Sequence, residues 1–225
     1  MPTIALHREL SRKSADIGAM ADLVARRPQS LPDVFDGLSA DQARIKYGCL
    51  KLLRLISERK PAILYPEFDK FVALLDSENN ILKWVAIIVI GNLATADSRK
   101  KIDRMLDRYL SPIAGPVLIT AANTVGGAAK IAVAKPRLAD RIARALMEVE
   151  AGNYQTAECR NVALGKVVES LTLFFDLVED RRPVLEFVQR QLKNPRTAVK
   201  RKAAEFLKKY SQEMSPKRMC LSNPQ

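Results

Sequence analysis

Histidine is nearly absent from this sequence, and His7 is the only one among 225 residues. Hydrolytic sites that activate serine or cysteine through an imidazole depend on this side chain, as do many zinc sites. His7 lies near the N-terminus, where we expect a mobile segment and a solvated side chain. The sequence therefore indicates no catalytic residue, no metal ligand set and no cofactor site, and we expect that the chain is not an enzyme.

Cysteine is also scarce, and the three residues Cys49, Cys159 and Cys220 lie at unrelated spacings. An odd number in this arrangement favours neither a disulfide framework nor a metal knuckle. Free thiols at apolar positions behave as small hydrophobic side chains in a reducing compartment. Residues 1–10 carry charges and lack the apolar core of a secretory signal. We therefore expect a cytoplasmic location.

Long apolar runs and aromatic residues are few. The longest apolar run, over 85–90, is far shorter than the roughly 20 residues that span a bilayer, so we expect no membrane helix. Aromatic residues make up 6% of the chain and include one tryptophan. Such a composition favours a core of alanine, leucine, isoleucine and valine over a row of aromatic stacking platforms.

Positive charge is abundant and unevenly placed. The chain has 37 lysine and arginine residues against 25 acidic ones, a net charge of +12. Residues 181–225 hold 12 basic and 3 acidic residues, so they carry +9 of that total. The basic character therefore belongs mainly to one end of the chain.

One pattern recurs five times: an apolar residue, a basic residue, two free positions, two small or apolar residues, a free position and two apolar residues. It begins at Ile45, Leu82, Val117, Cys159 and Val199, and the starts lie 37, 35, 42 and 40 residues apart. That period is typical of a solenoid of helix pairs. Expected second helices cover 41–57, 81–94, 117–133, 157–175 and 198–210, and expected first helices cover 31–37, 61–75, 97–110, 136–148 and 183–192.

These segments resemble the second helix of HEAT repeats. Val199, Lys200, Ala203 and Ala204 match that family's pattern closely, while Leu118 replaces the basic residue in the third copy. The resemblance implies an ARM/HEAT-like, right-handed α-solenoid of about five helix pairs. We expect a capping helix within an N-terminal segment at 1–30, a single repeat array at 31–210, and a flexible polar tail at 211–225.

Two features of the pattern call for a structural explanation. The recurring cations Lys46, Lys83, Arg160 and Lys200 are expected to pair with acidic or carbonyl groups near the turns and form a ladder, with ligand contact as the alternative. The Gly126–Gly127 pair lies inside an expected helix. Two helical glycines cost about 1 kcal/mol each relative to alanine, which favours close helix packing over a break that admits a partner.

The free positions of the second helices are the candidate binding site, because solenoids bind through the concave surface that such helices line. We predict partner contacts on this face, from an apolar and aromatic N-terminal half to a polar C-terminal half, by Tyr47, Lys51, Trp84, Ile88, Ile119, Asn123, Asn161 and Arg201. An apolar anchor with polar surroundings is typical of protein-binding hot spots. The alternative is that Trp84 and Ile88 belong to a central buried helix.

The last repeat is the second candidate site. It concentrates the basic residues Lys193, Arg196, Lys200, Arg201, Lys202, Lys208 and Lys209. They form either the polar cap of a solenoid or a contact for phosphates. We therefore predict a non-enzymatic scaffold that binds a protein or peptide partner and no membrane, with a nucleic-acid-binding protein as the alternative. Some compact HEAT-like proteins of similar size and basicity are DNA glycosylases for alkylated bases, but the chain lacks the grouped aromatic and acidic residues that such an activity implies.

Overall fold

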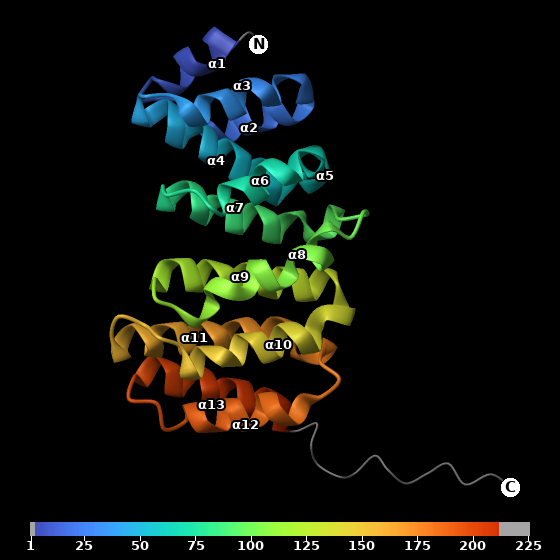
Figure 1. Cartoon of the computed structure of the whole chain (residues 1–225), viewed down its shortest axis with the longest axis vertical. Coiled ribbons are helices and arrows are strands. Elements are labelled where there is room, and N and C mark those ends of the chain that lie inside the picture. The colour runs from blue at the N-terminus through green and yellow to red at the C-terminus, as the bar shows by residue number, and fades with distance from the viewer. Residues whose placement is uncertain (1–2, 212–225) are drawn as a thin grey trace, which may run out of the picture.

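The structure, a computed structural model, describes residues 3–211 and the side chains of residues 5–210. Within that range every regular element is an α-helix or a short 3-10 helix (Figure 1). The all-α solenoid predicted from the repeat pattern is confirmed. Most of the predicted tail, residues 212–225, lies outside the described residues.

Helix pairs follow one another along the stack in chain order, with α1 and α13 at opposite ends (Figure 1). Three helices begin the chain: α1 (Thr3–Leu10), α2 (Ile17–Arg26) and α3 (Leu31–Asp36). The later first helices are α5 (Pro61–Leu64) with α6 (Phe68–Leu74), α8 (Lys101–Leu110), α10 (Ala139–Met147) and α12 (Arg181–Gln191). The second helices are α4 (Ala43–Arg59), α7 (Asn80–Asn92), α9 (Leu118–Ala134), α11 (Ala157–Phe174) and α13 (Thr197–Ser211).

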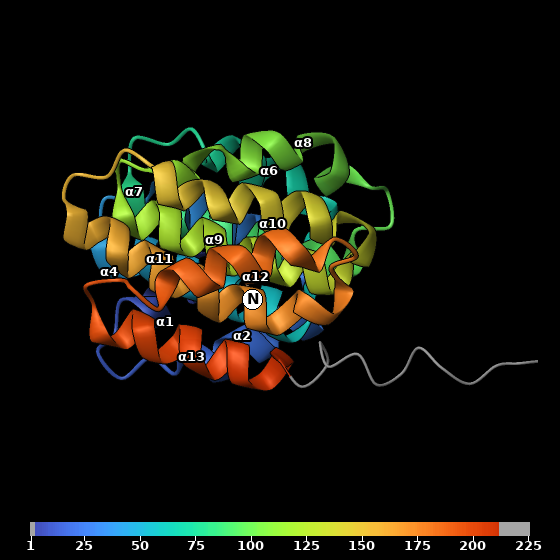
Figure 2. The same ribbon diagram turned by 90° about the horizontal axis from the view of Figure 1, so that it is seen from below.

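Each second helix contacts the next one, from α4 through α7, α9 and α11 to α13. Viewed along the stack, α8, α10 and α12 step across the molecule and do not superimpose, which is the twist of a solenoid (Figure 2). A continuous core of buried aliphatic residues runs through these layers. No single pair buries its apolar face alone, so the pairs are stable only as a stack.

Most of the few aromatic side chains lie in this core and not on the surface. Tyr109, Phe174 and Phe187 are buried, and each such ring contributes about 1.5–3 kcal/mol through removal from water. In the last repeat Phe175 packs against Phe206 with ring centroids 5.0 Å apart and against Tyr210 at 4.4 Å. The basic final repeat is therefore held to the array by an aromatic cluster beneath its surface charges.

Two local expectations were wrong. The helix expected over 61–75 is divided by a 3-10 turn at Tyr65–Glu67, because Pro66 supplies no backbone N–H for the helical hydrogen-bond pattern. The histidine expected to be solvated is half-buried, and residues 3–10 around it are helical. These residues form α1, which buries Leu6 and Leu10 and places His7 Nε2 2.9 Å from the Asp33 carbonyl oxygen.

The glycine pair in α9 has two different environments. A Cβ added at Gly91 of α7 would lie 2.8 Å from Gly127 Cα, so the two glycines set the close approach of α7 and α9. A Cβ at Gly127 would also collide with the Tyr109 hydroxyl, which donates a 2.9 Å hydrogen bond to the Ile87 carbonyl. At Gly126 the nearest such atom is Lys166 Cε, at 3.7 Å. Packing is confirmed as the role of Gly127.

A ladder of ion pairs joins successive repeats, but its members are not the predicted ones. The pairs join successive first helices or the short turns beside them, and they are Asp69–Lys101, Asp76–Arg108, Asp103–Arg137, Asp107–Arg141 and Glu150–Arg190. Lys46, Lys83, Arg160 and Lys200 have no carboxylate partner within the described part of the chain. The basic residue of the repeat pattern therefore does not form the ladder. The pairs that do are mostly solvent-exposed, and each contributes at most about 1 kcal/mol.

Candidate interaction surface on the second helices

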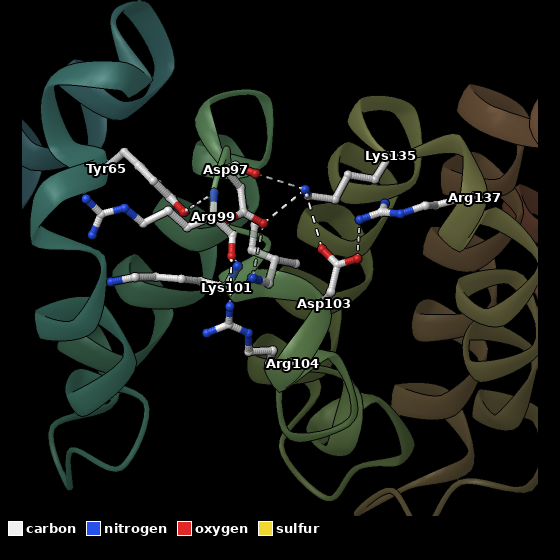
Figure 3. A network of polar contacts seen from close by, with 9 residues as sticks. Tyr65, Asp97, Arg99, Lys101, Asp103, Arg104, Lys135 and Arg137 are labelled. Carbon is white, nitrogen blue, oxygen red and sulfur yellow. Dashed lines mark hydrogen bonds and ion pairs between the residues drawn. The ribbon is translucent and has the colours of Figure 1, made fainter.

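Two clusters of polar side chains span three repeats each, and the first of them surrounds Asp97 (Figure 3). The Asp97 side chain is 0% exposed. Its carboxylate accepts hydrogen bonds from the Tyr65 hydroxyl at 2.7 Å and from the backbone amides of Lys101 and Ile102 at 2.8 and 3.1 Å. The two amides lie in the first turn of α8, so Asp97 satisfies N–H groups that no helical carbonyl reaches.

Lysine and arginine neutralise the acidic residues of this cluster. Lys135 Nζ, at the end of α9, lies 3.0 Å from Asp97 and 3.5 Å from Asp103, and Arg137 pairs with the other oxygen of Asp103. Burial opposes ionisation of Asp97, but the hydrogen bonds that it accepts from Tyr65, Lys135 and two backbone amides outweigh that cost, so its pKa is lowered. Two carboxylates thus face two cations, which identifies the Asp97 cluster as a structural clamp between repeats.

The second cluster is a chain of hydrogen bonds across α4, α7 and α9. Ser57 Oγ donates to the Arg54 carbonyl at 2.7 Å, and Asn92 Nδ2 donates to Ser57 Oγ at 2.8 Å. Lys130 Nζ then donates to Asn92 Oδ1 at 2.6 Å. Ser57 and Asn92 are buried, and Lys130, at the end of this chain of hydrogen bonds, is exposed. We call this set of hydrogen bonds the Lys130 chain.

The Lys130 chain ends at a cavity of about 730 Å³ on the face of the second helices. Glu58 and Thr95 lie on its wall beside Lys130. Val133 on α9 and Leu173 on α11 also line the cavity, and they are 50% and 65% exposed. Two large aliphatic side chains are therefore exposed to water next to a positive charge, in an open hollow lined mainly by four consecutive second helices.

The charges around this cavity do not cancel. Arg54 neutralises Glu58, with Nε 2.9 Å from the carboxylate. Glu169 is shared by Lys166 at 2.7 Å and Lys202 at 2.6 Å, and the hydrogen bonds from these two lysines lower the pKa of Glu169.

Lys130 itself has no carboxylate partner among the described residues. The second-helix face is thus positive at its centre.

Trp84 and its neighbours on α7 and α9 are the central part of the predicted contact set. Trp84 is half-buried, and its Nε1 donates a 2.9 Å hydrogen bond to Thr120 Oγ1. Ile88 and Asn123 are half-buried, whereas Ile119 is 50% exposed. The Trp84 side chain therefore bridges α7 and α9 and is neither fully in the core nor fully exposed.

The outer members of the predicted set lie at the two ends of the array. Tyr47 and Lys51 line a hollow of about 480 Å³ between α4 and the N-terminal helices. Asn161 Oδ1 accepts a hydrogen bond from Asn194 at 3.2 Å, and Arg201 is exposed, 3.8 Å from Glu205. None of the eight predicted residues is among the described residues that line the 730 Å³ cavity.

The candidate contact residues were taken only from the third and seventh positions of each repeat. The cavity residues lie further along the same helices and were therefore missed. Residues three or four apart lie on the same helix face, so the face that carries Ile88 continues to Asn92 and Thr95. In the same way the face of Asn123 continues through Gly126 to Lys130 and Val133. Extending the pattern by two turns would have reached the cavity.

The basic last repeat is partly neutralised within the array. Arg196 pairs with Glu158, Lys202 with Glu169, and Lys209 Nζ lies 2.8 Å from the Tyr210 hydroxyl. Over residues 5–210, Lys193, Lys200 and Lys208 have no carboxylate partner.

Other reactive groups are few in the part of the chain that the structure describes. Burial raises the pKa of the Cys49 thiol to about 12, so it is protonated and unreactive near neutral pH. Across residues 3–211 no three histidine, cysteine, aspartate or glutamate side chains gather as metal ligands. No helix in that range has the length and apolar content to cross a bilayer.

Comparison with known proteins supports the fold. No protein-family model matches the chain, and no curated protein matches it. A designed armadillo repeat protein is similar in structure, with a TM-score of 0.56 and 13% sequence identity, over 91% of this chain and 98% of the designed one. The chain therefore has an armadillo-like helical repeat fold, the fold class that the recurring pattern predicted.

Proposed function

We propose that this chain is a non-enzymatic scaffold that binds a segment of a protein partner on its second-helix face. The observation that carries the proposal is the 730 Å³ cavity, where exposed Val133 and Leu173 adjoin the Lys130 ammonium group. Covering exposed aliphatic surface is favourable, and apolar anchors in a hollow with polar neighbours are typical of binding hot spots. Stacked repeats create an extended surface suited to a chain-like ligand.

The predicted contact residues then flank this cavity. Ile119 offers exposed apolar surface, and the amide groups of Asn123 and Asn161 have the donors and acceptors that pair with peptide backbone. Trp84 and Ile88 form the wall behind them, and Tyr47 with Lys51 extends the surface toward the N-terminal hollow. The partner segment would run along several repeats with its main anchor at the cavity.

Selection of displayed random peptides on the immobilised full chain tests this proposal. We expect recovered binders to lose at least about tenfold in affinity for Leu173→Glu, because a charge in the anchor site is desolvated on binding. Leu192→Glu is the matched control, since Leu192 is an exposed leucine (42%) outside the cavity. Binders that tolerate Leu173→Glu as well as Leu192→Glu would contradict the proposal.

Nucleic-acid binding is the second candidate function, and the unpaired lysines of the last repeat favour it. Lys193, Lys200 and Lys208 are free to contact phosphates. Three such contacts predict a log–log slope of binding against salt of roughly −3 on random duplex. Changing Lys200, Arg201 and Lys202 together to glutamate should abolish this binding. Absence of binding at about 50 mM salt would exclude this function.

A further inference from the structure

We infer that the segment bound at the cavity is acidic and apolar, with a carboxylate that meets Lys130 and an adjacent aliphatic side chain that packs on Val133 and Leu173. This inference rests on the proposed function and adds the chemistry of the partner. It follows from the contacts of the Lys130 ammonium group, the charges around it and the position of the apolar side chains.

Lys130 is hydrogen-bonded to a neutral group. An ammonium group has three N–H donors, and Lys130 uses one of them on Asn92 Oδ1 at 2.6 Å. Asn92 is fixed in turn by the buried Ser57 hydroxyl. The structure therefore positions a cation at the cavity without neutralising it. A ligand carboxylate would supply the missing counter-charge through a charge-assisted hydrogen bond.

Neighbouring acidic residues leave no counter-charge for Lys130. Glu58, which also lines the cavity, pairs with Arg54, and Glu169 pairs with Lys166 and with a lysine of α13. A neutral or basic segment would cover Lys130 and remove the water around its ammonium group without supplying a counter-charge, which is unfavourable. The cavity thus discriminates by charge as well as by shape.

Val133 lies three residues after Lys130 on α9, so the two side chains occupy neighbouring positions on one helix face, about 5–6 Å apart at Cβ. Leu173 approaches from α11 on the other side of the cavity. A ligand that satisfies both must carry its acidic and aliphatic side chains close together. In a helical peptide, an acidic residue and a leucine three residues apart lie on one face and meet this requirement.

Fluorescence anisotropy with three series of short labelled peptides tests the inference on the full chain. The series share leucine positions and length, and differ in having glutamate, glutamine or lysine between the leucines. We expect the glutamate series to bind most tightly. Lys130→Met should weaken it about tenfold, as for loss of a hydrogen bond to a charged group. Lys208→Met, which has the same net charge, should change affinity by less than about twofold.

Leu173→Glu provides a second variant at an exposed position, where folding does not depend on the leucine side chain. It should abolish binding of the glutamate series and improve that of the lysine series. Equal binding of the glutamate and glutamine series, with both still lost in Leu173→Ser, would overturn this inference and leave the proposed function standing. Insensitivity of all three series to Leu173→Glu and Leu173→Ser would overturn both.

Discussion

The Asp97 cluster and the Lys130 chain each span three repeats, but they differ in charge balance. The charges of the Asp97 cluster are paired within it, so we call it closed, whereas the Lys130 chain ends in a cation with no carboxylate partner among residues 5–210, so we call it open. Around Asp97, two carboxylates face Lys135 and Arg137, and the Asp97 carboxylate also accepts hydrogen bonds from two backbone amides. In the Lys130 chain, the buried Asn92 amide leads to a cation whose only described hydrogen-bond partner is that amide.

Burying a charge is costly unless it is paired. The closed cluster therefore suits a role in the fold, and the open chain at a hollow suits a role in binding.

The largest effect is expected from breaking the closed cluster. Asp97→Ala leaves Lys135 buried without its closest partner and removes the carboxylate that accepts two amides of α8. We expect a loss of about 3 kcal/mol in the free energy of unfolding, measured by urea denaturation. Asp107→Ala, which removes an exposed ion pair with Arg141, should cost less than about 1 kcal/mol. Equal losses would show that the Asp97 cluster is no clamp.

A smaller but clear loss of stability is expected from a substitution at Gly127, where α9 packs closely on α7. Gly127→Ala places a Cβ against the buried Tyr109 hydroxyl and close to the Ile87 carbonyl of α7, and should cost about 2 kcal/mol. Gly126→Ala meets only Lys166 Cε at 3.7 Å and should stabilise the helix by about 0.5–1 kcal/mol. Opposite signs for these neighbouring substitutions in thermal and urea unfolding would support the packing. A destabilising Gly126→Ala would contradict it.

Acid should weaken the Asp97 cluster. The pKa of Asp97 is lowered in the folded state, so its contribution to stability is present above the unfolded pKa of about 4 and is lost as pH falls through the folded value. The difference in unfolding free energy between the wild type and Asp97→Asn should therefore shrink from pH 7 to pH 3. A difference that stays constant over this range would contradict the lowered pKa.

A small effect on stability is expected from Lys130→Met. This change removes one hydrogen bond to a neutral acceptor and should cost about 1 kcal/mol, although it should weaken binding of the acidic peptides. Urea denaturation with circular dichroism checks the first part. A loss as large as that of Asp97→Ala would place Lys130 among the groups that maintain the fold and would remove the contrast between the two networks.

The sequence predicted the fold well because small and aliphatic residues recur at one period. All five second helices lie within a few residues of their expected bounds, for example α9 at Leu118–Ala134 against 117–133 and α11 at Ala157–Phe174 against 157–175. The break at Pro66 was foreseeable from proline chemistry. Helix α1 was missed because its few apolar residues acquire a partner only when it packs on the first repeats.

The ladder was assigned to the wrong cations because the repeat pattern marks sequence position and not the distance to an acid. The signal that finds the true pairs is an acidic and a basic residue one repeat apart, as in Asp69–Lys101 and Asp103–Arg137, separated by 32 and 34 residues.

The cavity is lined by small residues such as Gly91 and Ala129 on neighbouring helices. Its volume therefore follows from helix packing, which a pattern along one helix does not contain.

Amide NMR spectra recorded during titration of the full chain with the glutamate and leucine peptide would locate the binding site. We expect shifts concentrated at Asn92, Lys130, Val133 and Leu173, and unchanged resonances at Asp97 and Lys135. Shifts confined to α13 or centred on Asp97, or identical shifts with the lysine and leucine peptide, would contradict this expectation.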